Sequence, residues 1–196
     1  MLEQHIRNAL LEHKQAIDSL VENEEVVSTL KAAAEAMAEC LRSGGRIFSC
    51  GNGGSMCDAM HFAEEMTGRF RSSRPAYSAA AISDPAHIAC VGNDYGYDEV
   101  FARYIEAHGR EGDVLIGITT SGTSRNVLRA FEAARAKGMR LVALTGRKDC
   151  PAVKAADYAL ATPGGRWADR VQEQHILCIH ILIEMIERQL DPANYA

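Results

Sequence analysis

The chain has 196 residues, 47% hydrophobic and 24% charged, which is the composition of an ordinary globular protein with room for one sizeable core. Its formal net charge of -5 argues against general nucleic-acid binding, so an anionic ligand would have to be held by local dipoles and a few basic groups. No apolar run reaches membrane-spanning length, and residues 1–7 lack the apolar core of a signal peptide. We therefore expect a cytoplasmic protein that binds neither membrane nor nucleic acid.

The first 45 residues are predicted to form two helices. Apolar residues recur there at helical spacing, with a break near residues 22–24, and Gly44 and Gly45 end the second helix. Both helices are long and acidic on balance, and they lack the short glycine turn of a DNA-reading pair. We expect them to pack against the domain or against a second subunit.

From Arg46 onward, strands and helices alternate. The apolar segments predict strands at 46–50, 77–83, 113–119, 139–145 and 158–162, and helices near 55–70, 97–108, 124–138 and 166–190. Short connections between such elements are typical of an α/β fold, in which right-handed crossovers place helices on both faces of a parallel sheet. Ligands of these sheets bind beyond the carboxyl ends of the strands.

Residues 50–55, Cys-Gly-Asn-Gly-Gly-Ser, form a glycine-rich turn between the first strand and a helix. The glycines let a ligand approach the backbone, and the helix N-terminus offers unpaired N–H groups, so the turn predicts a phosphate site. Nucleotide binding is disfavoured. A Walker loop needs a lysine that residues 51–68 lack, and a dinucleotide fingerprint needs glycine in place of Met56, although Asp84 ends the next predicted strand where a ribose-binding acid could lie.

A second turn, at residues 119–124, carries five hydroxyls around one glycine, in the order Thr-Thr-Ser-Gly-Thr-Ser. One hydroxyl would be enough for a helix N-cap, whereas five favour a cradle for phosphate oxygens. Both turns follow strands of one parallel sheet, so we expect them to face the same pocket.

Two helices supply ionisable side chains near that pocket. After the first turn, an arc of roughly 100° carries His61, Glu65 and Arg69. On the last helix, an arc of roughly 80° carries Asp169, Gln172 and His180, with His175 on another side. The simpler interpretations are an exposed polar face for the first set and a core histidine for His180. Asp169 either orients His180, contacts a ligand, or is a charge favoured by the helix dipole.

Six cysteines, at positions 40, 50, 57, 90, 150 and 178, form no Cys-x-x-Cys pair. We interpret them as small buried hydrophobic residues. Cys57 lies one turn before His61 and is the lesser candidate for a metal ligand.

In combination these motifs resemble the sedoheptulose 7-phosphate isomerases, also called phosphoheptose isomerases, over essentially the whole chain. The segments that carry the resemblance are 50–55, 58–65 with Gly68 and Arg69, 91–94, 119–124, 169–173 and 180–183. It implies a single sugar isomerase (SIS) domain over 1–196, a flavodoxin-like three-layer α-β-α sandwich around a five-stranded parallel sheet. Residues 1–45 would be a helical pair used in packing or oligomerisation, and 46–196 an α/β core ending in a long helix.

The resemblance also implies an aldose-ketose isomerase that converts D-sedoheptulose 7-phosphate to D-glycero-D-manno-heptose 7-phosphate through an enediol, on the route to heptose of bacterial lipopolysaccharide or related heptosides. The family forms homotetramers with active sites between subunits. By position, Glu65 and His180 would be the acid–base pair. One zinc per subunit would bind His61, Glu65, Gln172 and His180. The implied substrate contacts are Asn52, Gly53, Gly54, Ser55, Glu65, Arg69, Asn93, Asp94, Thr119, Thr120, Ser121, Ser124, Asp169 and Gln172.

Two other classes of protein are weighed against an enzyme. A non-catalytic relative with the sugar isomerase fold, which binds the bacterial replication initiator, lacks residues matching Glu65 and His180, and this chain has both. A sugar-phosphate-sensing regulator would need a DNA-binding domain, for which the chain has no room. Departures from the family pattern, at Met56, Thr119 and Thr123, affect only fine geometry, and residues 146–153, which differ from glycine-rich versions of the segment, are assigned no function.

Overall fold

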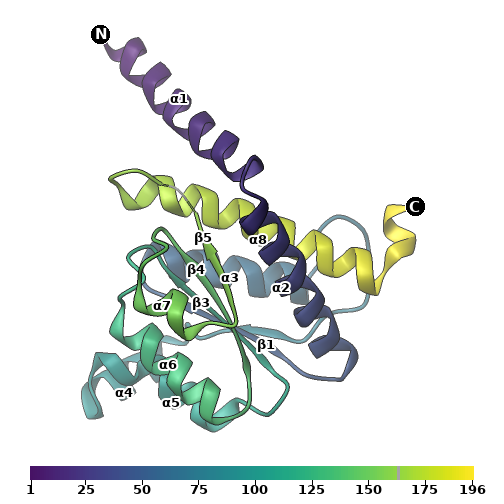
Figure 1. The fold of residues 1–196 in the computed structure, drawn as a ribbon. Coiled ribbons are helices and arrows are strands. Elements are labelled where there is room, and N and C mark those ends of the chain that lie inside the picture. The colour runs from purple at the N-terminus through teal and green to yellow at the C-terminus, as the bar shows by residue number, and fades with distance from the viewer. Residues whose placement is uncertain (163) are drawn as a thin grey trace.

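The computed structural model describes residues 1–162 and 164–196, and its centre is a five-stranded parallel sheet (Figure 1). The strands are β1 (Ile47–Gly51), β2 (Ala79–Ala81), β3 (Val114–Thr119), β4 (Arg140–Thr145) and β5 (Tyr158–Ala161). They lie in the order β2-β1-β3-β4-β5, and every neighbouring pair is parallel. This is the flavodoxin-like strand order, so the predicted fold class is confirmed.

Helices cover both faces of the sheet. They are α1 (Leu2–Val21), α2 (Glu24–Arg42), α3 (Gly54–Thr67), α4 (Pro85–Asp94), α5 (Val100–His108), α6 (Arg125–Ala136), α7 (Pro151–Ala155) and α8 (Ala168–Leu190), with 3-10 turns at Tyr97–Glu99 and Pro192–Tyr195. The alternation along β3 shows how the layers form. Val114 and Ile116 pack with α2, α3 and α8, whereas Leu115 packs with α5 and α6 on the other face.

Two helices were not predicted. Asp84 was expected to end a strand, but β2 ends at Ala81 and Asp84 instead caps α4, where its carboxylate accepts a hydrogen bond of 2.7 Å from the His87 backbone N–H. Pro85 and Pro151 are the first residues of α4 and α7, a position that suits proline because its missing N–H would be unpaired there anyway. The apolar spacing of these two segments is too weak to predict a helix, but the residues that start a helix are present in both.

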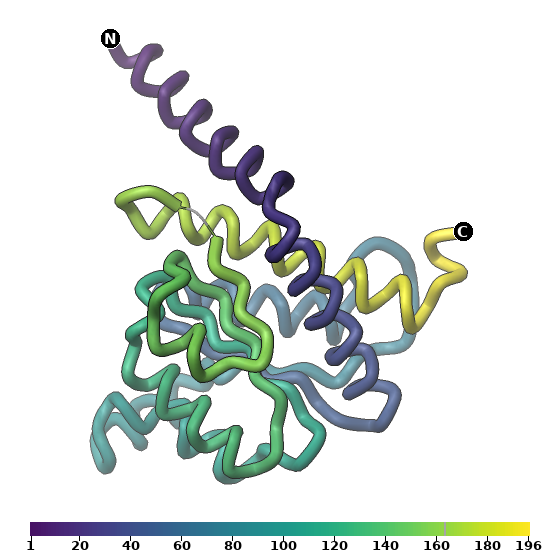
Figure 2. Tube along the Cα trace, in the orientation of Figure 1, coloured from purple at the N-terminus to yellow at the C-terminus, as the bar shows by residue number. Residues whose placement is uncertain are grey.

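The two N-terminal helices behave differently from each other. α2 packs on α8 and the sheet, and buries Leu30 and Met37 in the core. α1 extends away from the domain (Figure 2) and reaches it mainly through the start of α8, where His13 Nδ1 lies 2.8 Å from Glu173 Oε2. The exposed large apolar side chains of α1 are Leu2, Ile6, Leu10, Leu11 and Val21. The helix therefore presents an apolar surface that its own chain leaves uncovered.

Among the helices that the structure describes, none has the length and apolar character needed to cross a bilayer.

Candidate functional site

The glycine turn and the hydroxyl turn lie side by side, because β1 and β3 are neighbours in the sheet. The Asn52 and Asn126 side-chain amides exchange two hydrogen bonds, of 2.9 and 2.8 Å, and so tie the glycine turn to α6. Tyr97 Oη donates a third bond of 3.1 Å to Asn52 Oδ1. The sequence predicted that both turns face one pocket, but it gave no indication of Asn126 or Tyr97 in this link.

Gly53 and Gly54 are each required in the first turn, but for different physical reasons. Gly53 adopts a φ of 55°, which other L-residues rarely do, and it precedes α3. Gly54 is required by close approach, since a Cβ atom there would lie 2.5 Å from Gln172 Nε2. The turn therefore brings the start of α3 directly against α8.

The hydroxyl turn is organised as a cluster rather than as a helix cap. Ser124 precedes α6, yet its hydroxyl caps no helix N–H and instead lies 2.9 Å from Thr119 Oγ1. Ser121 Oγ accepts from the backbone N–H and the hydroxyl of Thr123, at 3.2 and 3.0 Å. A cavity of about 150 Å³ borders this turn at Thr120 and Ser121. The simpler capping role therefore does not account for Ser124, and the cradle stays a prediction.

Three ionisable side chains converge between α3 and α8. His61 Nε2 lies 2.9 Å from His180 Nε2 and 3.6 Å from Glu65 Oε1, and one ligand atom from each residue falls within 4.8 Å of the others. Glu64 Oε1 contacts the other imidazole nitrogen of His61 at 3.0 Å, which orients the ring. The sequence missed Glu64, although its i, i+3 spacing from His61 would have indicated it.

The environment of His180 favours its neutral form. Burial lowers the pKa of His180 below its ordinary value, and the neighbouring His61 imidazole lowers it further, while Glu65 acts in the opposite direction. A neutral imidazole has a lone pair that can accept a proton or bind a metal. Two imidazoles and one carboxylate are also the donor set of many catalytic zinc sites, so these residues fit zinc.

Gln172 and Asp169 share the helical arc of His180 but lie at different heights on α8. Gln172 is two turns earlier, about 12 Å along the axis, and its side chain lies against Gly54. Asp169 is three turns earlier, about 16 Å along the axis, and its exposed carboxylate accepts from the Arg170 backbone N–H at 2.9 Å. The suggestion that Asp169 orients His180 is therefore wrong, because the two side chains are too far apart.

Three further predicted residues lie at or just beyond the C-terminal ends of α4 and α3. Asn93 and Asp94 end α4, where the Asn93 amide donates to Asp94 Oδ1 at 2.7 Å. Arg69 was expected on the helical face of His61, but α3 ends at Thr67 and Arg69 lies exposed beyond it. That part of the same-face prediction is wrong, since the helical rotation stops before Arg69.

Four of the cysteines are buried as predicted, but Cys57 and Cys90 are exposed. Burial raises the pKa of the Cys50 and Cys178 thiols to about 12, which keeps them protonated and inert. Cys57 does not belong to the cluster of His61, Glu65 and His180.

Comparison with known proteins agrees with this geometry. The SIS domain family matches residues 12–146. The chain is 50% identical over 190 residues to a phosphoheptose isomerase of Sodalis glossinidius, an alignment that spans 97% of this chain and 98% of the relative. The chain belongs to the phosphoheptose isomerase family. A family member from Enterobacter sp. (strain 638) is 52% identical, over 97% of this chain and 99% of its own.

Solved structures of the phosphoheptose isomerase family share the whole fold. The structure from Neisseria gonorrhoeae has a TM-score of 0.88 and 40% sequence identity, and it covers 95% of this chain and 99% of its own. The structure from Francisella tularensis has a TM-score of 0.89 and 34% identity, and it covers 96% and 99%. Membership of the phosphoheptose isomerase family makes this chain an isomerase, in agreement with the motifs of its two turns.

Proposed function

We propose that the chain converts D-sedoheptulose 7-phosphate to D-glycero-D-manno-heptose 7-phosphate, a step toward bacterial heptose precursors. The observation that carries this proposal is the convergence of His61, Glu65 and His180 on helices whose other ends meet at the phosphate turn. His61 is seven residues, about 10 Å along α3, from Gly54. A phosphate held at the turn would thus leave the far end of an extended sugar at the three ionisable side chains.

The isomerisation moves a proton between C1 and C2 and therefore needs a base for carbon and an acid for the oxygens. We assign Glu65 to the carbon-bound proton and His180 to the oxygens. The 2.9 Å separation between His180 Nε2 and His61 Nε2 lets the two rings share one proton. His180 can then give a proton to one oxygen and receive one back as the enediol collapses.

A zinc ion fits the same residues. We propose that His61, Glu65 and His180 bind it. Gln172 is the proposed fourth ligand, and its side chain, which lies against Gly54 in this chain, would have to turn along α8 to reach the ion. When bound, zinc supplies Lewis-acid polarisation of the substrate carbonyl. An imidazole nitrogen that binds zinc has no lone pair left for a proton, so metal titration separates the two uses of His180.

The single chain leaves apolar surface that further copies would cover. A groove of about 530 Å³ runs between α2 and α8 and is lined by Val27, Leu30, Ile181 and Met185. The exposed apolar row of α1 is a second such surface. We propose that the chain forms a homotetramer and that subunit contacts complete active sites that are half-exposed in one chain. Sedimentation or light scattering would test the stoichiometry.

We further place the enzyme in the cytoplasm, where reducing conditions match the six free cysteines. The test of the whole proposal is to mix purified, metal-defined protein with sedoheptulose 7-phosphate and to follow aldose formation by NMR. Binding of the sugar without isomerisation, under zinc-replete conditions, would contradict the enzyme and favour a non-catalytic interaction protein.

A further inference from the structure

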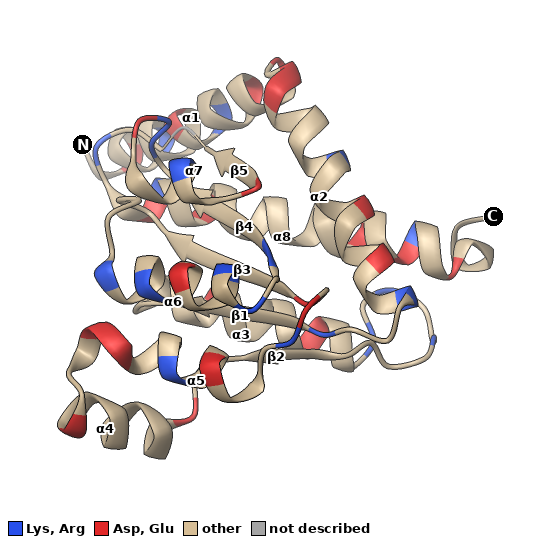
Figure 3. Ribbon diagram, turned by 60° about the horizontal axis from the view of Figure 1, so that its bottom comes forward, with Lys and Arg blue, Asp and Glu red and all other residues tan. Residues whose placement is uncertain are grey.

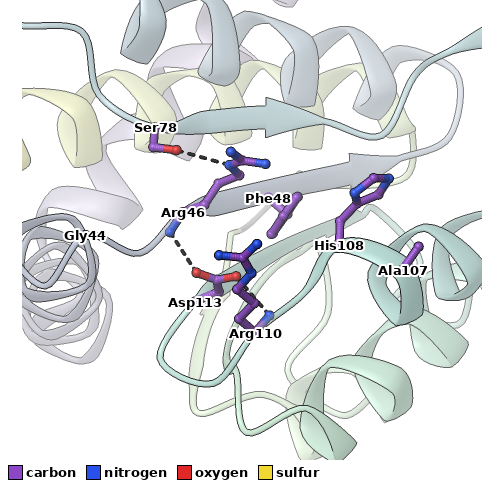
Figure 4. A pocket seen from close by; sticks show the side chains of 8 residues that line it. All are labelled: Gly44, Arg46, Phe48, Ser78, Ala107, His108, Arg110 and Asp113. Carbon is purple, nitrogen blue, oxygen red and sulfur yellow. Dashed lines mark hydrogen bonds between the residues drawn. The ribbon is translucent and has the colours of Figure 1, made fainter.

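A second polar pocket lies at the edge of the sheet opposite the phosphate turns. It encloses about 150 Å³ at the N-terminal ends of β1 and β3, between Arg46, Ser78, His108, Arg110 and Asp113 (Figure 4). The glycine and hydroxyl turns follow the carboxyl ends of the same two strands. The pocket is therefore separated from the candidate catalytic site by the length of the sheet.

Two guanidinium groups border this pocket. Arg46 Nε donates to Ser78 Oγ at 3.1 Å, and its guanidinium carbon lies 5.7 Å from the centre of the Phe48 ring. Those two contacts hold the Arg46 side chain and leave its terminal nitrogens free to donate. Arg110 reaches the pocket from the loop before β3, as the close view shows (Figure 4). Within residues 1–162 and 164–196, neither guanidinium forms an ion pair with a carboxylate.

Asp113 is the acidic residue of the pocket, and its carboxylate accepts hydrogen bonds from backbone N–H groups. Its carboxylate accepts from the backbone N–H of Arg46 at 2.8 Å and of Arg110 at 3.0 Å, and the residue is 4% exposed. It thus fixes the main chain from which both arginines project. The pocket keeps a net positive charge, although the chain as a whole carries -5.

We propose that this pocket binds a phosphate-sized oxyanion, either free phosphate or the phosphoryl group of a small metabolite. Its volume equals that of roughly five liquid waters, whereas sites for drug-sized or nucleotide-sized ligands begin near 300 Å³. The planar forks of two arginines match the geometry of phosphate oxygens and pair with them bidentately. A buried carboxylate that sets the spacing of the arginines makes the pocket a built site rather than a surface patch.

The test uses the Ser121→Ala/Ser124→Ala chain, in which the proposed catalytic cradle is weakened. Calorimetric titration with inorganic phosphate should show one remaining site per chain. Adding Arg46→Gln and Arg110→Gln should weaken that site at least about tenfold, because charge-assisted hydrogen bonds are lost. The control is Arg103→Gln, which removes one positive charge from α5 outside the pocket, as either single arginine substitution does inside it, and should leave the affinity unchanged. Glycerol 3-phosphate in place of phosphate tells a phosphomonoester site from one for the free ion.

Two results would overturn the proposal: no phosphate binding in the cradle variant, or unchanged binding after both arginines are replaced. Arg110→Gln alone guards against misfolding, since the Arg110 side chain makes no hydrogen bond in the described part of the chain. Crystals soaked in selenate give an independent answer. An anomalous peak between Arg46 and Arg110 supports the site, and a peak only at the hydroxyl turn contradicts it.

Discussion

His61 and His180 bring their Nε2 atoms to 2.9 Å across the contact between α3 and α8. At that distance one nitrogen must carry the hydrogen that the other accepts, unless a metal lies against both. Gly54 meets Gln172 near the start of the same two helices, so α3 and α8 run side by side in one direction. This alignment selects which residues of each helix form the site.

Removal of the acid–base groups should nearly abolish turnover. Glu65→Gln keeps the side-chain shape and His180→Asn keeps a polar side chain, but neither can transfer a proton, so each should lower kcat by about 10²- to 10⁴-fold. Steady-state kinetics with sedoheptulose 7-phosphate measure the loss, and the oligomer size should not change. The matched control is Glu106→Gln, an exposed carboxylate of α5 that should leave kcat alone. A folded variant at either site with near-normal kcat would remove that residue from the mechanism.

Zinc should bind at about one ion per subunit, as measured by elemental analysis after dialysis. His61→Ala should weaken binding, because it deletes one of the three converging ligand atoms. Zinc binding needs deprotonated ligands, so zinc affinity should fall as the pH drops. The lowered pKa of His180 reduces the competition from protons at that residue. Full activity of metal-free protein, with no rise on adding zinc, would contradict a catalytic metal.

The hydroxyl turn should affect both binding and rate. Ser121→Ala and Ser124→Ala should raise KM and also lower kcat, because a misplaced phosphate misaligns the reacting carbons at the far end of the sugar. The control is Ser28→Ala, in which the lost hydroxyl bonds only to the Glu25 carbonyl on the exposed face of α2. Unchanged kinetics in the double serine variant would rule out the cradle.

His175 should make the fold sensitive to acid. The residue is fully buried, and desolvation lowers its pKa to about 4 from an ordinary value of 6.5. The folded state resists protonation of His175, whereas the unfolded state does not. The free energy of unfolding is therefore unaffected by His175 above pH 6.5, and it decreases as the pH falls from 6.5 toward 4. The full loss is about 3 kcal/mol, from 1.36 kcal/mol per pKa unit.

Urea unfolding at pH 7.5 and pH 5 tests this in the wild type and in His175→Leu. The variant should lose less stability between the two pH values, whereas His5→Gln, on exposed α1, should behave as the wild type. Equal pH dependence in His175→Leu would show that other groups cause the acid sensitivity.

The sequence by itself predicted the elements whose causes are local. Glycines 53 and 54, the five hydroxyls at 119–124 and the apolar runs of the strands act within a few residues. The structure places both turns between a strand and a helix, and four of the five strands agree with the predicted bounds to within one residue, whereas β2 is shorter. The i, i+4 pair of His61 and Glu65 could be predicted in the same way, since side chains one helical turn apart lie close both in their direction from the helix axis and in their position along it. The chain also contains enough separate motifs to indicate its family before any fold was known.

Only the tertiary structure decided which distant residues meet. A helical arc predicts the direction of a side chain from the helix axis but not its position along that axis. Asp169, Gln172 and His180 were therefore predicted to share one face, although Asp169 lies about 16 Å along the axis from His180. The pairing of α3 with α8 selects His180, and the pairing of β1 with β3 joins Asn52 to Asn126. The Arg46 and Arg110 pocket depends on the same strand pairing. Contacts between segments far apart in sequence arise from packing, which no local pattern encodes.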